Sequence, residues 1–563
     1  METRVPTTSE ETEQLHRTID WKGAFWVASG VPALVLFSIG GIAGTVGTPA
    51  FAVWAVSMLL GFIQSFTYAE IAGLFPNKSG GASVYGAAAW LKYGKLIAPL
   101  SVWCNWLAWT PVLSLGCTIA AGYILNALAP VPAVDSPVVI QWLAANGGKT
   151  AADGVAALTP AIRNWSLLSV TLAGVHISLG ATFFIGAMLS LCVFAMQHRG
   201  ILETARVQLF MGLLVIVPML IIGIVPFLNG KVNWANFSPF VPLATPYAAA
   251  PGTWNLHGWT LVLGGLFIAA WSTYAFETAI CYTSEFKNPA TDTFNAIFYS
   301  GLLCIVVFTL VPFTFQGFLG VTGMIAPGVV DGTGVAAVMA NMVGGGAFSR
   351  GLMVLLMVLA LLLSTMTALA GSSRTLYQGS VDGWLPRYLS HVNSHGAPTR
   401  AMWTDFSFNL ALLSFTASDT ASFYFVLAIS NCGYIIFNFL NLHAGWIHRI
   451  DNGHIARPWK APAAVLAAGG VLAFVNAMLM GAGAQVWNPA ALWTSAVAAS
   501  IIIPVFCFRH YVQDGGKFPE RMLEDLGCAG GQLGERKAGM LPYLALAGGV
   551  VVVLISARFF RLG

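Results

Sequence analysis

The stretch Trp259–Tyr282 reads WTLVLGGLFIAAWSTYAFETAICY and carries a single charged residue, Glu277. It is apolar and long enough to cross a bilayer, which takes about 20 residues of helix. A carboxylate at that depth is costly unless it faces a cavity or a partner, so an ionisable residue inside a span marks a functional site by default. The stretch therefore predicts a membrane helix with a buried site at Glu277.

The composition excludes most soluble classes of protein. Hydrophobic residues make up 57% of the 563 residues, charged residues make up 9%, and the mean hydropathy is +0.75. A soluble chain of this length needs more charge to cover its surface. The net charge of +4 is spread over loops and argues against a nucleic-acid partner. The sequence contains no metal-ligand spacing, nucleophile elbow or phosphate-binding loop, so we expect no enzyme, cofactor or metal site.

A second irregular stretch, IGGIAGTVGTP at Ile39–Pro49, lies in the first apolar run. Its glycine density weakens a helix and predicts unwinding around Ile42–Thr45. The free N–H end of an unwound helix suits a carboxylate, and the free C=O end suits an ammonium, so a zwitterionic amino acid matches both ends. Close helix–helix packing is the alternative use of such glycines. Interruptions in the first and sixth spans together predict a secondary transporter.

Long apolar runs between charged or Pro- and Gly-rich loops predict an all-α polytopic membrane protein. We expect twelve core transmembrane helices, near 23–49, 51–75, 97–129, 165–196, 203–228, 258–283, 293–318, 350–379, 400–417, 421–447, 462–484 and 490–511. A further apolar run, 541–557, is long enough to span the membrane; alternatively, it lies against the helix bundle. Residues 83–93 predict a short interfacial helix, and the connection 130–163 has room for another.

The distribution of Lys and Arg predicts a cytoplasmic N-terminus. Residues 1–22 lack the apolar core and cleavage site of a signal peptide, so we expect the first helix to be retained. Segments then facing outward carry Lys149, Arg163, Lys231 and Arg350. Segments then facing inward carry a much larger set: Arg4, Arg17, Lys22, Lys78, Lys92, Lys95, Arg199, Arg206, Lys287, Arg374, Arg387, Arg400, Arg449, Arg457, Lys460, Arg509, Lys517, Arg521, Arg536 and Lys537.

The order of the spans fits two inverted repeats of five helices each, because five spans that start from inside precede five that start from outside. The broken helices 1 and 6 would open the two repeats. The domains expected on this basis are a tail at 1–22, a transporter domain at 23–511 with repeats at 23–228 and 258–447 and peripheral helices at 462–511, and a C-terminal segment at 512–563.

In the sixth span Trp271, Tyr274 and Glu277 recur every three residues and would share one helix face, with Ser272 beside them. Such a stripe can stack on an amine and match its charge. Ordinary packing is the alternative for the two aromatic residues. For Glu277 the alternative is a structural carboxylate that accepts hydrogen bonds from the broken helix.

Polar residues in other spans have two readings each. Asn431 in the tenth span is a candidate substrate contact or a hydrogen bond between helices. Ser364 and Thr367 in the eighth span are candidates for a sodium site with first-span carbonyls, or bond to their own helix. His176 and His443 lie in predicted spans, where packing is favoured over a proton relay.

An ordered set of motifs resembles the amino acid–polyamine–organocation (APC) superfamily of permeases, which has the leucine-transporter fold. The likeness covers residues 23 to about 510. The motifs are Ile39–Thr45 in the first span, Tyr68-Ala-Glu70 with Phe75-Pro76 and Ser79-Gly80-Gly81, Phe276-Glu277 with Glu285–Pro289, and Ser373-Arg374 with Asp382–Pro386 and Ala397-Pro398-Thr399.

Within that superfamily the sixth span most resembles bacterial arginine/agmatine exchangers, which implies that Trp271 caps the substrate as a gate. The same likeness implies substrate contacts from the backbone of Ile42, Ala43, Gly44, Thr45 and Val46. Asn105 of the third span is a further candidate substrate contact, although it departs from those exchangers, which have an aromatic residue there. Val207–Val217 lacks the fifth-span lysine that replaces sodium in some relatives.

Together these observations predict a bacterial inner-membrane permease that moves an amino acid or polyamine-like amine by alternating access, with H⁺, Na⁺ or a counter-substrate as the coupled species. A sodium-coupled symporter of the same fold for another small organic solute is one alternative. A nutrient sensor that no longer transports is another, although the polar tails at 1–22 and 512–540 are small for a signalling domain. The substrate and the oligomeric state stay open.

Overall fold

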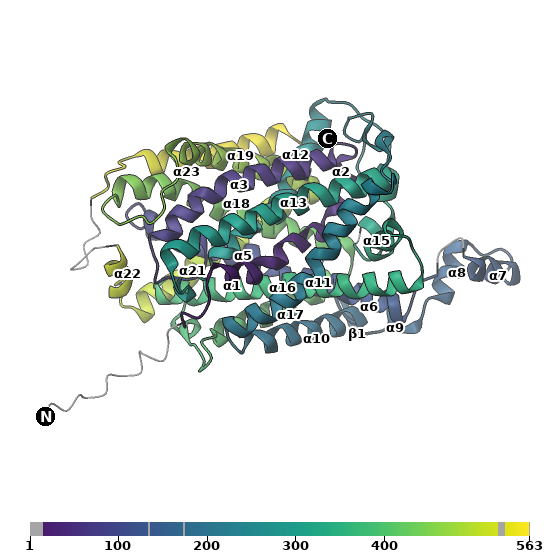
Figure 1. The fold of residues 1–563 in the computed structure, drawn as a ribbon, viewed down its shortest axis with the longest axis horizontal. Coiled ribbons are helices and arrows are strands. Elements are labelled where there is room, and N and C mark those ends of the chain that lie inside the picture. The colour runs from purple at the N-terminus through teal and green to yellow at the C-terminus, as the bar shows by residue number, and fades with distance from the viewer. Residues whose placement is uncertain (1–14, 133–135, 173–174, 331, 527–534, 562–563) are drawn as a thin grey trace.

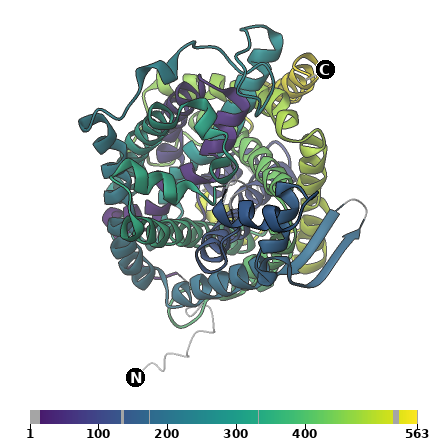
Figure 2. The same ribbon diagram turned by 90° about the vertical axis from the view of Figure 1, so that its right-hand side faces the viewer.

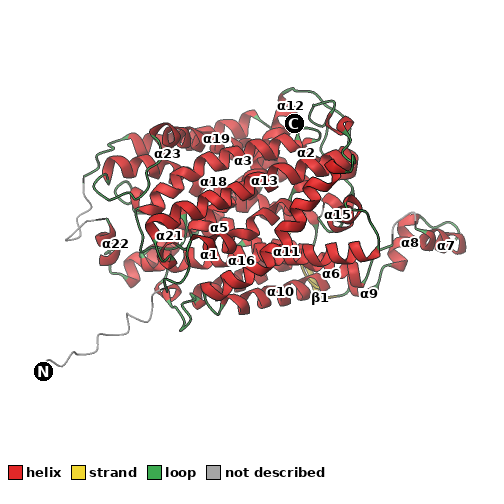
Figure 3. Cartoon of the chain, in the orientation of Figure 1, coloured by secondary structure: helices red, strands yellow, loops and turns green. Residues whose placement is uncertain are grey.

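A computed structural model describes residues 15–132, 136–172, 175–330, 332–526 and 535–561. It is a bundle of long helices with one small hairpin of strands (Figures 1 and 3), so the predicted helical polytopic fold is confirmed. Eleven helical segments among the described residues are long and apolar enough to cross a membrane. They are Trp21–Val46, Ala50–Gly73 (α3), Ile97–Leu128, Ile201–Leu228 (α11), Leu256–Glu285, Pro289–Met324 (α13), Ala347–Val381 (α16), Thr420–Asp451 (α18), Ala463–Trp487 (α19), Ala491–Gln513 and Leu541–Phe559 (α23).

Several of these segments are composite. Ile97–Leu128 consists of α5 (Ile97–Trp109) and α6 (Pro111–Leu128), and Ala491–Gln513 consists of α20 (Ala491–Ser500), α21 (Ile502–Cys507) and η6 (Phe508–Gln513). Two shorter helices, α10 (Ala181–Gln197) and α17 (Thr399–Thr416), also run through the bundle. The thirteenth apolar run forms α23, which packs along α19.

The predicted fourth span, 165–196, is helical only in its second half. Its first half forms the antiparallel strands β1 (Ser166–Leu172) and β2 (Val175–Gly180), which lie at the edge of the bundle (Figure 2). The physical reason is the alternation of Ser with Val, Thr, Leu and Ile, which favours a strand over a helix. His176, which was expected inside a span, lies in this hairpin beside Thr171.

The connections carry short helices. The long connection after α6 forms α7 (Pro137–Ala145), α8 (Ala151–Leu158) and α9 (Ala161–Asn164); α7 and α8 project from the bundle at the end opposite α22 (Glu520–Asp525) in Figure 1. The predicted interfacial helix is present as α4 (Ala82–Trp90), but it is buried between α5 and α18. The remaining short helices are η2 (Trp234–Phe237), α14 (Pro327–Val330), α15 (Val335–Met342) and η5 (Arg387–Ser390).

The first span is interrupted, but not where its glycines predicted. It runs as α1 (Trp21–Val27), a 3₁₀ segment η1 (Ala28–Phe37) and α2 (Ile39–Val46), with non-helical backbone at Ser38. Ile42–Thr45 is therefore helical, and the predicted unwinding at those residues is wrong. The break lies just before the glycines, where Pro32 inside the segment removes a backbone donor.

The sixth span is interrupted as predicted. Its α-helix α12 (Leu256–Thr273) ends before Tyr274, and the chain continues as the 3₁₀ segments η3 (Ala275–Ile280) and η4 (Thr283–Glu285). Glu277 lies in the middle of η3. The interrupted parts of the first and sixth spans pack against each other.

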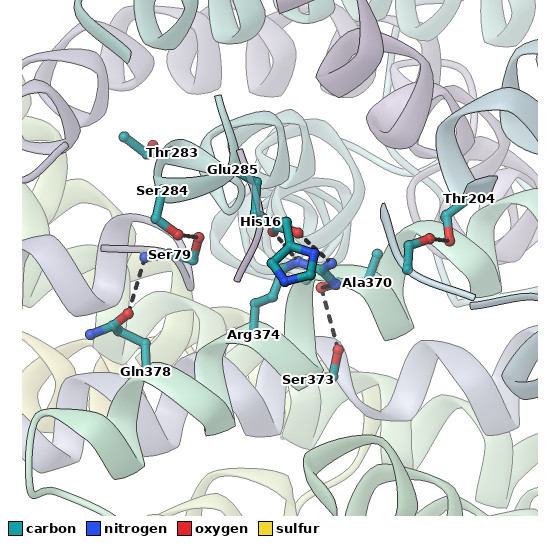
Figure 4. Close-up of polar contacts among 12 residues, drawn as sticks. His16, Ser79, Thr204, Thr283, Ser284, Glu285, Ala370, Ser373, Arg374 and Gln378 are labelled. Atoms are coloured by element: carbon teal, nitrogen blue, oxygen red, sulfur yellow. Dashed lines mark hydrogen bonds and ion pairs between the residues drawn. The ribbon is translucent and has the colours of Figure 1, made fainter. Parts of the chain in front are cut away.

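Buried ion pairs join helices at the face of the bundle where Leu15–Asp20 lies, here called the N-terminal face. Arg374 of α16 donates two hydrogen bonds to Glu285, Nε to Oε2 at 2.5 Å and Nη2 to Oε1 at 2.9 Å (Figure 4). Backbone N–H groups of Thr18 and Ile19 donate to the carbonyl of Glu285. Residues 18–19 are thereby held across the end of the sixth span at this face.

Two further clusters of buried charged residues join segments at the same face. Glu70 of α3 accepts hydrogen bonds from Arg449 and Arg457. Lys78, in the loop after α3, lies 2.7 Å from Asp382 and 3.0 Å from Asp525. Burial alone would lower the pKa of Lys78, but the two carboxylates raise it above its ordinary value, so the ammonium stays charged.

A first prediction concerns the buried pair. Glu285→Gln leaves the Arg374 guanidinium buried without a counter-charge, so we expect a loss of about 3–5 kcal/mol in the free energy of unfolding, measured as a fall in thermal stability of the purified protein. The control is Glu203→Gln, which breaks an exposed pair with Arg206 and should cost about 1 kcal/mol or less. Equal losses in the two variants would contradict the stabilising role given to the buried Glu285–Arg374 pair.

A second prediction concerns orientation. In a background without native cysteines, Asn146→Cys and Ser394→Cys each place one thiol at an exposed position, in the α7–α8 connection and in the loop before α17. We expect a membrane-impermeant maleimide to label position 146 in intact cells and position 394 only after permeabilisation, because the cationic face should lie inside. The reverse pattern would overturn the predicted orientation.

Candidate functional site

The candidate site lies where the two interrupted spans meet. The hydroxyl of Ser272, near the end of α12, donates to the carbonyl oxygen of Leu34 in η1 at 3.3 Å. A 3₁₀ segment leaves backbone groups without their α-helical partners, and a side chain from the other interrupted span satisfies one of them. The first and sixth spans are thus joined through main-chain groups as well as through packing.

Trp271 lies beside this junction. Its side chain is 2% exposed, and its indole Nε1 donates to Ser430 Oγ of α18 at 2.8 Å and to the Ala108 carbonyl of α5 at 3.3 Å. Its ring packs against Phe37 of η1, with ring centres 5.7 Å apart. One face of the indole therefore touches the interrupted first span, and its polar edge links α5 and α18.

Glu277 lies closer to the N-terminal face than Trp271 does, and its side chain is 1% exposed. Trp109 Nε1 donates to its Oε1 at 3.1 Å, whereas its Oε2 has no hydrogen-bond partner among the described residues. No Lys, Arg or His in the described ranges lies within 4 Å of the carboxylate. The side chain is thus an acceptor with spare capacity and no counter-charge.

The N-terminus of α4 faces the same carboxylate. The backbone N–H of Ala82 approaches it, which adds a favourable helix-end interaction for a negative charge. Gly81, just before α4, has φ +85, and a Cβ there would lie 2.8 Å from Cys281 Sγ and 3.5 Å from Glu277 Oε2. A glycine at this position therefore allows the loop to approach η3.

Other buried polar atoms near these spans also lack partners among the described residues, among them Ser38 Oγ, Asn105 Nδ2 and Asn431 Oδ1. Asn105 of α5 lies near the Glu277 carboxylate, and its Oδ1 accepts from Thr375 of α16 at 3.0 Å. Asn431 of α18 donates to the carbonyl of Phe267. Buried polar atoms in proteins are usually satisfied, so unpartnered donors and acceptors around a helix break are the groups a bound ligand would use.

Tyr274 does not continue the predicted stripe. Its hydroxyl donates to Asn476 Oδ1 of α19 at 3.1 Å, inside a cluster of amides that includes Gln64 and Asn438. The α-helix ends at Thr273, so the spacing that would align residues three apart no longer applies beyond it. Trp271 and Glu277 therefore contact α5, while Tyr274 points toward α3 and α19.

The backbone groups of Ile42–Val46 are engaged elsewhere. The carbonyl of Gly44 accepts from Tyr247 N at 2.6 Å, and that of Val46 accepts from Leu243 N at 3.1 Å, both from the loop before α12. The hydroxyl of Thr45 donates back to Gly41 within the helix. Helix α2 packs along α12, but the first-span carbonyl that accepts a side-chain hydrogen bond from the sixth span, Leu34, belongs to η1.

The expected sodium ligands also have partners. Thr367 Oγ1 donates to the Val27 carbonyl at 2.6 Å and accepts from Gly30 N and from Gln208 Nε2. Gln208 of α11 donates to the Val27 carbonyl as well, at 3.0 Å. Ser364 donates to Leu361 in its own helix. A side-chain amide thus bridges the carbonyl and the hydroxyl that were expected to face a cation.

Gln208, Ser430 and Asp405 were missed by sequence reasoning. Gln208 lies in the segment searched for a lysine, and its amide was not considered. Asp405 is the one acid within α17, so the rule that singled out Glu277 applies to it too. Ser430 carried no signal that separates it from other small polar residues in spans.

The comparison with protein families agrees with this arrangement. A family model described as amino acid permease matches residues 19–507. The chain belongs to the amino acid permease family. A search among curated proteins found no match.

Membership in the amino acid permease family has direct consequences. The chain is a multi-pass membrane transporter of amino acids or related compounds, and it is not an enzyme. The match extends from the residue before Asp20 through α21, so it covers both interrupted spans and the helices that contact them. It does not distinguish among permeases, and the likeness of the sixth span to arginine/agmatine exchangers stays a prediction.

A third prediction concerns Trp271. Trp271→Ala removes the ring that separates η1 from α18 and should weaken binding of the best amino acid from a thermal-shift screen by about tenfold or more. Trp271→Phe keeps most of the ring area and should retain much of the affinity, although it loses the bond to Ser430. Equal binding by two well-folded variants would reduce Trp271 to packing.

Proposed function

We propose that this permease moves an amino acid or related amine by alternating access, with the substrate held between the interrupted spans and α5, α16 and α18. The observation that carries the proposal is Glu277: a fully buried carboxylate with a free Oε2 and no cation nearby in the described part of the chain. A carboxylate in this setting binds an ammonium group well, because little water competes for it.

The neighbours of Glu277 support an amino acid as the ligand. Asn105 Nδ2 is a free donor near the carboxylate, and Ser38 Oγ is a free hydroxyl at the first-span break. Together they offer a negative group for the substrate amine and neutral polar groups for its carboxylate. Trp271 supplies an aromatic wall between these elements.

The contacts of Thr367 favour coupling to protons or to a counter-substrate over coupling to sodium at the expected position. The Val27 carbonyl and the Thr367 hydroxyl already accept from Gln208 Nε2. A sodium ion would have to displace that amide and leave its donors unsatisfied in the bundle, which is costly. The sodium-coupled symporter therefore becomes the second candidate.

We place the N-terminal face in the cytoplasm of a bacterial inner membrane, because most Lys and Arg residues lie at that face. The structure is then closed on the cytoplasmic side by the Glu285–Arg374 pair and by residues 18–19. The two inverted repeats predicted at 23–228 and 258–447 would move relative to each other to open it.

A fourth prediction tests the role of Glu277 in proteoliposomes. As the counter-ion of the substrate amine, Glu277→Gln should weaken amino acid uptake driven by a pH gradient and amino acid exchange without a gradient, each by about tenfold or more. Glu277→Asp keeps the charge and should recover part of both rates. Glu203→Gln should behave like the wild type.

Two other outcomes are informative. Loss of gradient-driven uptake with intact exchange would make Glu277 the proton carrier instead of the counter-ion. Wild-type rates in both assays would reduce Glu277 to a residue that supports the N-terminus of α4, and the proposed site would be wrong.

A further inference from the structure

A second unpaired carboxylate, Asp405 of α17, lies inside the bundle and has no part in the proposed substrate site. Its side chain is 0% exposed, and it forms no ion pair among the described residues. Among the other buried acids, Glu70, Glu285 and Asp382 each face a cation. Asp292 and Asp451, near the ends of α13 and α18, have no ion pair in the described structure but accept hydrogen bonds from backbone N–H groups, which neither Glu277 nor Asp405 does among the printed bonds of the described residues.

Two neutral donors hold the Asp405 carboxylate. Trp106 Nε1 of α5 donates to Oδ1, and Ser372 Oγ of α16 donates to Oδ2 at 2.6 Å. One turn further along α17, Asn409 donates to Thr110 Oγ1 at 2.7 Å and accepts from Ser114 N at 3.1 Å, at the junction of α5 and α6. The carboxylate is thus fixed in place by groups that suit its charged form but do not neutralise it.

No charged group competes at this position. Elements α6, α10, α16, α18, β2 and η5 pack against α17, and none of their described titratable side chains bonds to Asp405. Arg374 of α16 is paired with Glu285, and Cys117 of α6 meets Ser190. Tyr388 of η5 meets Thr404, and His176 of β2 meets Thr171. The described cations and acids of α18 and η5 bind elsewhere: Arg449 to Glu70, Asp451 to Tyr93, and Arg387 to Asp514.

Such a group has two accessible states. Ionised, it is stabilised by two hydrogen bonds but carries an uncompensated buried charge; protonated, it loses the charge and retains a hydrogen-bonding carboxyl group. Taking up a proton is the least costly way to remove the charge, because no cation is within reach. Intramembrane carboxylates in this situation serve as proton sites in other transporters.

Helices α5 and α16 carry the residues that contact Asp405 and also residues that contact Glu277 or its neighbour Asn105. On α5, Trp106 donates to Asp405, and Trp109, three residues on, donates to Glu277. On α16, Ser372 donates to Asp405, and Thr375, three residues on, donates to Asn105 and to the Gly80 carbonyl. A change in charge at Asp405 therefore acts on the helix turns that hold the groups around Glu277.

We propose that Asp405 is the proton-binding residue that couples this permease to a pH gradient, at a site separate from Glu277. The proposal rests on the proposed transport function, and it divides the two roles between two carboxylates: Glu277 binds the substrate amine and Asp405 binds the transported proton. The proton binds to the Asp405 carboxylate from one side of the membrane and leaves as a free proton on the other.

The experiment uses the full chain in proteoliposomes and a mixture of tritiated L-amino acids as the probe. Uptake is measured with an inward pH gradient and as exchange without one. In Asp405→Asn the ratio of uptake with the gradient to uptake without it should fall to about one, because a gradient cannot drive a carrier that no longer binds the proton. Exchange should remain near the wild-type rate. A gradient effect that persists in Asp405→Asn overturns the proposal.

Ser372→Ala tests proton binding through the pH dependence of uptake, which a purely structural role of Asp405 would leave unchanged. It keeps the titratable carboxyl group and removes one donor to its charged form, so the pH of half-maximal gradient-driven uptake should move up by about one unit. An unchanged midpoint overturns the proposal. This variant also decides the matter if Asp405→Asn proves poorly folded.

Infrared difference spectra between acid and neutral pH separate this proposal from the transport function. The wild type and Glu277→Gln should both show a protonated carboxyl band that Asp405→Asn lacks. If that band is present while the wild type takes up none of the probe, the proposed function fails and the proton site stands. A band that is retained in Asp405→Asn and lost in Glu277→Gln overturns the proton site.

Discussion

Inside a bilayer every polar group must find its partner within the protein, and this constraint organises the centre of the molecule. The first and sixth spans both leave the α-helical path, at η1 and Ser38 and at Tyr274 and η3. Each break frees backbone groups that water would satisfy in a soluble protein. Here the partners are side chains from other helices, and those side chains determine which helices meet.

The partners are few and specific. The Ser272 hydroxyl donates a hydrogen bond to the Leu34 carbonyl, and the Thr367 hydroxyl and the Gln208 amide donate to the Val27 carbonyl. Buried polar atoms of Glu277, Asn105, Ser38 and Asn431 have no partner in the described structure, and they lie on η3, on α5, at the first-span break and on α18. The helix breaks therefore both require a polar centre and leave part of it free, which is what a transporter needs to bind a small polar solute.

Hydropathy predicted most of the helices because a membrane-spanning helix needs a long, uniformly apolar stretch of sequence. It failed at residues 165–180, where an equally apolar stretch alternates in small polar and branched residues and forms a hairpin. The carboxylate of Glu277 was found because a charge in an apolar run is visible without knowing its neighbours. Asp405 carries the same signal inside the predicted span 400–417, but it was not singled out there.

The glycines of the first span were read as a break, and their packing explains the error. A Cβ at Gly40 would lie 2.3 Å from the Val329 carbonyl oxygen, and one at Gly41 would lie 2.3 Å from the Tyr424 hydroxyl. The glycines let α2 approach α14 and α18, while the break falls at Ser38 beside them. Close approach to distant segments is not visible in local sequence, and the same holds for Tyr274, whose amide partner Asn476 lies some two hundred residues away in the chain.

Helix α16 connects the parts of the molecule that a transport cycle must coordinate. Thr367 contacts the first span, Ser372 contacts Asp405, Arg374 contacts Glu285, and Thr375 contacts Asn105. These residues lie on neighbouring turns of one helix, at 1.5 Å of rise per residue. A rigid helix cannot change its contact at one of these positions without disturbing the others. If the N-terminal face opens by separation of Arg374 from Glu285, the same displacement of α16 would alter the hydrogen bonds around both interior carboxylates. The buried Glu285–Arg374 ion pair and the polar centre around Glu277 and Asp405 are therefore linked through one helix.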